Sequence, residues 1–175
     1  MPEGLLTEIG AGFAHMSPWV AFGRLFAALV LGGAIGFERE IRARPAGLRT
    51  HMLVAMAACL FILIGQGLSD LGFGQGTERQ VDPLRLIEAV TQGVAFLAAG
   101  IIFTSRGRVR NITTGASMWL AGAVGLGCGA GQVLLSGMAT IMVIVVIAAL
   151  GAVERRWGKP PRTEGDADTE RADEA

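Results

Sequence analysis

Two cysteines and two histidines are the side chains in this sequence whose types could bind a metal ion or carry redox chemistry. Their spacing argues against both roles, because Cys59 and Cys128 form no CxxC pair and neither His15 nor His51 has a ligand nearby in the sequence. The P-loop pattern, the GxSxG nucleophile pattern and paired carboxylates are also missing from the sequence. We therefore expect a protein that is not an enzyme and needs no cofactor, with both cysteines as small buried packing residues; a metal site stays undecided.

The elements that must position these residues are long apolar stretches. Uncharged runs of 20, 17 and 43 residues follow Arg49, Glu88 and Arg110, respectively. A membrane-spanning helix needs about 20 mostly apolar residues, so the longest run fits two helices, divided within the glycine-rich segment 125–132. Another apolar stretch is interrupted only by Arg24. The sequence predicts an all-α polytopic membrane bundle of five transmembrane helices, at 19–37, 51–68, 83–104, 112–128 and 132–152.

The composition excludes other classes of protein. Of the 175 residues, 51% are hydrophobic and 17% are charged, whereas a soluble domain carries about 25% charged residues. A soluble all-α core would leave these helices without a polar face, and a membrane β-barrel needs an alternation of apolar and polar residues that the sequence lacks. Because 15 basic residues balance 15 acidic ones, the chain also does not resemble a nucleic-acid-binding domain.

The basic residues predict the orientation and the domain organisation. The segments 38–50, 105–111 and 153–175 contain twelve Lys and Arg, whereas the opposite side of the predicted bundle holds Arg79 and Arg85. Basic loops remain in the cytoplasm, so we expect the N-terminus outside and the C-terminus inside. The predicted parts are an extracytoplasmic leader at 1–18, the transmembrane domain at 19–152, and a charged, disordered cytoplasmic tail at 153–175.

Charged residues inside the predicted spans are the first candidate site. Asp82 and Pro83 read as an N-cap and the first residue of a helix. Glu88 then lies about 7–8 Å along that helix at 1.5 Å per residue, and Arg24 lies at a similar depth in the first helix. We expect these two side chains to pair, as a structural ion pair or as a binding site. The predicted intramembrane polar cluster consists of Arg24, Arg85, Glu88 and Gln92.

The predicted cytoplasmic face is the second candidate site. Glu38, at the end of the first helix, can meet Arg49 or Arg110 at the starts of two other helices. The rule that basic loops stay inside explains the arginines, but it does not explain the interleaved acids or the neighbouring threonines. We expect this face to contact a partner or an anion, through Glu38, Arg39, Arg42, Arg49, Thr50, Arg110, Thr113 and Thr114.

Glycines spaced four residues apart predict close helix packing. Gly32 and Gly36 form one such pair in the first helix, and Gly125 and Gly129 form another near the end of the fourth. Small residues at this spacing allow helix backbones to approach closely in a membrane. Packing within one chain is favoured over packing between chains, and both remain open at this point.

The segments 24–61, 82–103 and 109–131, with their motifs GFERE, RPAGLRTH, DPLR and ITTGASMW, resemble the MgtC/SapB family of bacterial inner-membrane proteins. Two departures from the family pattern are Ala98, where a glycine is usual, and Asn111-Ile112, where a Gly-Leu-like pair is usual. Longer members of the family add a soluble cytoplasmic domain after the bundle, whereas this chain ends in a short charged tail. The resemblance implies a multi-pass inner-membrane protein linked to growth at low magnesium and, in pathogens, to survival inside host cells.

Three functions remain open. The preferred one is a non-catalytic regulator that binds other membrane proteins, with the lipid bilayer and a possible homo-oligomer as further partners and no nucleic acid. The alternative is a transporter of magnesium, another cation or a small solute, which a single acid among several arginines suits poorly unless copies form a ring. A lipid- or envelope-stress protein without a ligand is the third.

Overall fold

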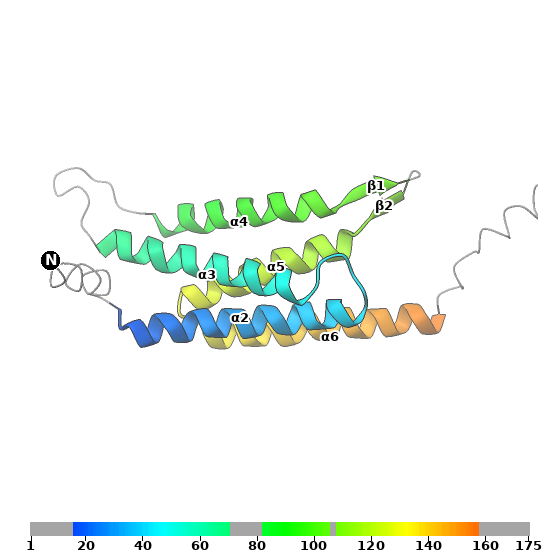
Figure 1. Ribbon diagram of the computed structural model, residues 1–175, viewed down its shortest axis with the longest axis horizontal. Coiled ribbons are helices and arrows are strands. Elements are labelled where there is room, and N and C mark those ends of the chain that lie inside the picture. Colours follow the sequence, from blue (N-terminus) through cyan, green and yellow to red (C-terminus); the bar gives the residue numbers. More distant parts are fainter. Residues whose placement is uncertain (1–15, 71–81, 106–107, 158–175) are drawn as a thin grey trace, which may run out of the picture. The chain divides into compact units, whose positions relative to one another are not determined.

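The computed structural model describes residues 16–70, 82–105 and 108–157. Its elements follow the chain as five helices and one hairpin (Figure 1). The helices are α2 (Pro18–Ile41), α3 (Leu48–Asp70), α4 (Pro83–Ile101), α5 (Ile112–Gly129) and α6 (Val133–Trp157), and the strands are β1 (Phe103–Ser105) and β2 (Arg108–Arg110). The prediction of five helices is therefore confirmed, and most of the predicted leader and most of the predicted tail lie outside the described residues.

The helix boundaries follow from local sequence signals. Pro18 and Pro83 each lie in the first turn of a helix, where the missing proline N–H costs nothing. Asp82 caps α4 as predicted, because its Oδ1 accepts a hydrogen bond of 2.9 Å from the Leu84 N–H. Three helices, α2, α3 and α4, are long and apolar enough to cross a membrane, whereas α6 contains a shorter apolar segment, Val133–Ala149.

The end of α4 differs from the prediction. The helix expected to reach residue 104 ends at Ile101, because residues 103–105 pair with 108–110 as an antiparallel hairpin in which Phe103 lies opposite Arg110. Asn111 follows this hairpin with φ of 65°, a left-handed conformation that asparagine tolerates better than most residues. Its side-chain amide donates to the Ile101 carbonyl over 3.2 Å, which ties the start of α5 to the end of α4. Asparagine at this position, where the family pattern has glycine, therefore suits the backbone.

Glycine contacts join α3 to α2 and α5. A Cβ atom added at Gly32 would lie 2.6 Å from the Cβ of Ala55, and one added at Gly36 would lie 2.8 Å from the Cα of Leu48. Gly125 and Gly129 of α5 pack in the same way on Ala55 and Cys59 of α3. The glycine pairs therefore serve packing within the chain, as the sequence analysis favoured.

The chain divides into two units at residue 145, within α6, and the structure describes residues 145–157 of the second unit. Within the first unit, α3 and α5 pack against each other and against both α2 and α4. Their apolar core includes Ala28, Ala55, Cys59, Leu63 and Cys128. This arrangement gives the α2–α3–α5 core two ends, named below for the arginine of α2 that lies at each: the Arg24 end and the Arg39 end.

Candidate functional site

A buried polar cluster lies at the Arg39 end and joins three helices. It consists of Arg39 from α2, His51 from α3, and Thr114 and Ser117 from α5, each at most 2% exposed. Arg39 Nη2 donates to Thr114 Oγ1 over 3.1 Å. His51 Nε2 lies 3.0 Å from Ser117 Oγ, and its Nδ1 lies 2.8 Å from the Gly47 carbonyl oxygen. Polar groups buried in a membrane bundle need such partners, so this cluster fixes how α2, α3 and α5 meet.

The hydrogen bonds between His51 and Ser117 can be arranged in two ways, depending on the protonation state of His51. The Gly47 carbonyl only accepts, so His51 Nδ1 carries a proton. Ser117 Oγ has one proton and two acceptors in reach, His51 Nε2 at 3.0 Å and the Thr114 carbonyl oxygen at 2.9 Å. In a neutral His51, Nε2 accepts a hydrogen bond from the Ser117 hydroxyl, whereas in a charged His51 it donates to Ser117 Oγ, and the hydroxyl then donates to the Thr114 carbonyl. The hydroxyl orientation therefore reports the charge on the ring.

The helix predicted at 51–68 begins at His51 and so puts this residue at the cytoplasmic surface, which is wrong. His51 is fully buried, because the glycines of α2 bring α2 and α3 together next to it. The sequence signal that could have identified it is Gly47, one helical turn earlier, whose carbonyl the ring contacts. Ser117, its other partner, was also missed because it lies 66 residues away in the chain.

The acids at this end have structural partners that the sequence did not predict. Glu38 pairs with Arg42, one helical turn later, and its Oε2 lies 3.9 Å from Arg39 Nη1. The expected contact of Glu38 with Arg49 or Arg110 is therefore wrong, because two arginines of its own chain segment are nearer. Glu40 Oε2 accepts a hydrogen bond of 2.9 Å from the Leu48 N–H and so caps the start of α3.

The loop between α2 and α3 depends on this cap. The Glu40 carboxylate occupies the space that a Cβ at residue 47 would need, so a larger residue there would have to displace this carboxylate from its cap. The motifs GFERE and RPAGLRTH thus contain side chains that fold the loop. The remaining predicted residues of this face do not join the cluster: Arg49, Arg110 and Thr113 are exposed, and Thr50 is half-buried.

The Arg24 end has a different arrangement. Arg24 Nη1 donates to the Gly129 carbonyl oxygen over 2.9 Å and lies 3.3 Å from Gln66 Oε1. Gly129 ends α5, where backbone carbonyls have no partner within the helix. Arg24 therefore joins α2 to the ends of α3 and α5, and Gln66 is a partner that the sequence analysis missed.

The predicted pair of Glu88 with Arg24 is wrong. Glu88 is exposed on α4, and its Oε1 accepts a hydrogen bond of 3.1 Å from Gln92 Nε2 on the same helix. Equal depth along two helices does not make them neighbours, and α2 packs on α3 and α5 instead of α4. Arg85 is likewise exposed, so the four predicted residues do not form one cluster.

The cysteines and histidines do not form a metal site among residues 16–70, 82–105 and 108–157, where no three His, Cys, Asp or Glu side chains lie close enough to hold an ion. Cys59 and Cys128 are free thiols, and both are fully buried in one apolar cluster. The prediction that they are packing residues is confirmed.

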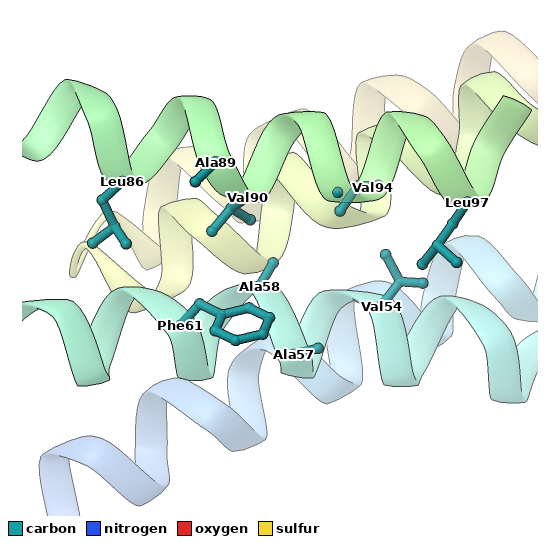
Figure 2. A pocket seen from close by; sticks show the side chains of 10 residues that line it. Val54, Ala57, Ala58, Phe61, Leu86, Ala89, Val90, Val94 and Leu97 are labelled. Carbon is teal, nitrogen blue, oxygen red and sulfur yellow. The ribbon is translucent and has the colours of Figure 1, made fainter.

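A groove between α3 and α4 is the second candidate site, with a volume of about 380 Å³ (Figure 2). Figure 2 shows side chains from both helices pointing into it. Small residues make up much of its lining, which consists of Val54, Ala57, Ala58, Phe61, Leu86, Ala89, Val90, Gly93, Val94 and Leu97. A Cβ added at Gly93 would meet nothing within 4 Å, so the groove is open there.

The apolar helices and the buried polar cluster that joins them define a helical membrane protein. The chain belongs to the MgtC family, whose model matches residues 25–156. It is 42% identical to Protein MgtC of Brucella abortus (strain 2308) over 126 residues, which are 72% of this chain and 49% of that protein.

A second relative carries a different name. The chain is 35% identical over 127 residues to YhiD of Escherichia coli (strain K12), whose name describes it as a candidate magnesium transporter; the match covers 71% of this chain and 57% of that protein. The chain thus spans about half the length of the curated relatives it matches. No solved structure matches it.

Proposed function

We propose that this protein is a non-catalytic regulator in the bacterial inner membrane that acts by binding other membrane proteins during adaptation to low magnesium or to envelope or intracellular stress. Membership of the MgtC family supports the setting. The groove between α3 and α4 is the observation that carries the binding role, and its occupant is a transmembrane helix of the regulated protein.

The spacing of the lining residues favours a helix over a flexible chain. On α4 these residues recur as 86, 89, 90, 93, 94 and 97, and on α3 as 54, 57, 58 and 61. Both series follow the three- and four-residue steps of one straight helix face. The stripes on α3 and α4 contain three alanines and one glycine. Such small residues let a third helix approach closely, which favours helix association in lipid, where the hydrophobic effect does not drive it.

Filling the groove tests this role. Ala89→Leu adds bulk inside the groove, whereas the matched control Ala123→Leu adds the same bulk at an exposed position of α5 outside it. We expect Ala89→Leu to abolish rescue of a deletion strain at limiting magnesium, with normal protein levels in the membrane, while Ala123→Leu rescues fully. Equal rescue by both variants would contradict the groove as the binding site, and a phospholipid that copurifies in the groove would identify a lipid as its occupant.

Transport is the second candidate, and the printed name of the Escherichia coli relative favours it. Magnesium uptake into proteoliposomes that contain only this protein separates the two functions. We expect uptake equal to that of empty vesicles. Uptake above this level that Glu88→Ala abolishes would establish a transporter and overturn the regulator.

A further inference from the structure

The two sides of α4 differ in chemistry. Val90, Val94 and Ala98, spaced four residues apart, are the buried side. The opposite side carries an exposed stripe at steps of three and four residues, defined here as the α4 outer stripe: Arg85, Glu88, Gln92, Ala95 and Ala99. The outer stripe lies away from the groove lining, which includes none of these residues.

Contact between the polar residues of this stripe and lipid chains is energetically unfavourable. At 1.5 Å per residue, Gln92 lies about 13–14 Å from the start of α4, which is near the middle of a helix of 19 residues. The bond between Gln92 and Glu88 leaves the second carboxylate oxygen and the amide oxygen of Gln92 for other partners. Of the three helices that can span a membrane, α4 is the least apolar and also the least buried by its own chain. Polar groups at this depth face protein or water in membrane proteins.

We propose that the α4 outer stripe is the interface of a parallel homodimer, with a second copy of this chain as its occupant. The stripe carries a positive and a negative side chain three residues apart, Arg85 and Glu88. Across a two-fold axis along the helices, each Arg85 faces Glu88 of the partner subunit, so the same stripe is complementary to itself.

The remainder of the stripe fits the same arrangement. Gln92 meets Gln92 of the partner subunit, and two side-chain amides can each donate to and accept from the other. Ala95 and Ala99 are small residues four apart, a spacing that lets two helix backbones approach closely. Polar bonding near one end and close packing near the other therefore follow one continuous line along α4.

Energy transfer between donor- and acceptor-labelled copies of the full chain in liposomes, over a series of protein-to-lipid ratios, tests the dimer. We expect Ala95→Leu to raise the dissociation constant about tenfold or more, a change that corresponds to the upper range of one interhelical contact. The matched controls Ala89→Leu and Ala123→Leu should leave the dissociation constant unchanged, because neither residue lies on the outer stripe.

A charge mixture tests the two-fold symmetry directly. The variants Arg85→Glu and Glu88→Arg should each fail to associate with themselves, because like charges then face each other, whereas a mixture of the two should restore energy transfer. A monomeric wild-type protein at all ratios would overturn the proposal, as would a mixture that stays monomeric while wild type dimerises. Dimers that Ala89→Leu disrupts and Ala95→Leu does not would place the interface in the groove and also overturn it. Because this test uses purified protein, its failure leaves the regulatory function standing.

Discussion

Each end of the α2–α3–α5 core contains an arginine of α2 within an apolar bundle, and the two arginines have different hydrogen-bond partners. Arg24 is partly exposed and donates to a backbone carbonyl at the end of α5. Arg39 is 2% exposed and donates to a threonine side chain, next to a histidine and a serine that are equally buried. An arginine beside the C-terminal end of a neighbouring helix can donate to carbonyls that have no partner within that helix, whereas a fully buried arginine away from such an end needs an acceptor side chain on another helix.

The largest expected effect tests this difference directly. Arg39→Met should lower the free energy of unfolding by about 2–4 kcal/mol, because it removes a buried charged hydrogen bond and leaves Thr114 and Glu38 without that partner. Arg24→Met is the matched control and should cost about 1 kcal/mol or less. Unfolding measured in bicelles or mixed micelles gives both values, and equal losses would contradict the distinction between the two ends.

An intermediate effect is expected within the buried polar cluster. Ser117→Ala should cost about 0.6–1.7 kcal/mol, the range of interhelical hydrogen bonds in membranes. A double-mutant cycle with His51→Leu should show positive coupling between the two sites, since each variant removes the same bond of 3.0 Å. Additive losses would mean that Ser117 bonds to the Thr114 carbonyl instead.

The smallest expected effect concerns conservative replacement. Arg24→Lys should change the free energy of unfolding by less than about 0.5 kcal/mol, because a lysine can still donate to the end of α5 and extend towards water. Arg39→Lys should cost more, since an ammonium group lacks the planar fork that reaches Thr114 beside Glu38. Unfolding under the same conditions compares the two, and an equal tolerance for lysine would remove the distinction.

The sequence predicted the positions of the helices, which depend on apolar runs and local capping signals. It did not predict which side of each helix a side chain lies on. Long apolar runs predicted five helices, and Asp82 with Pro83 predicted the start of α4. Glu88 and Arg24 were paired by depth alone, but depth does not determine which way a side chain faces around its helix. His51 was misplaced for the same reason, because α3 is apolar on all sides and gives no buried face to identify.

The long sequence separation of the buried polar cluster also constrains how the chain is made. Ser117 is synthesised 66 residues after His51, and Thr114 75 residues after Arg39. At about 5–20 residues per second, His51 is complete about 3–13 seconds before its partner exists. Until α5 follows, the first two helices hold unpaired polar groups in or beside the bilayer. Synthesis of this protein therefore includes an interval in which Arg39 and His51 exist without the partners that α5 supplies.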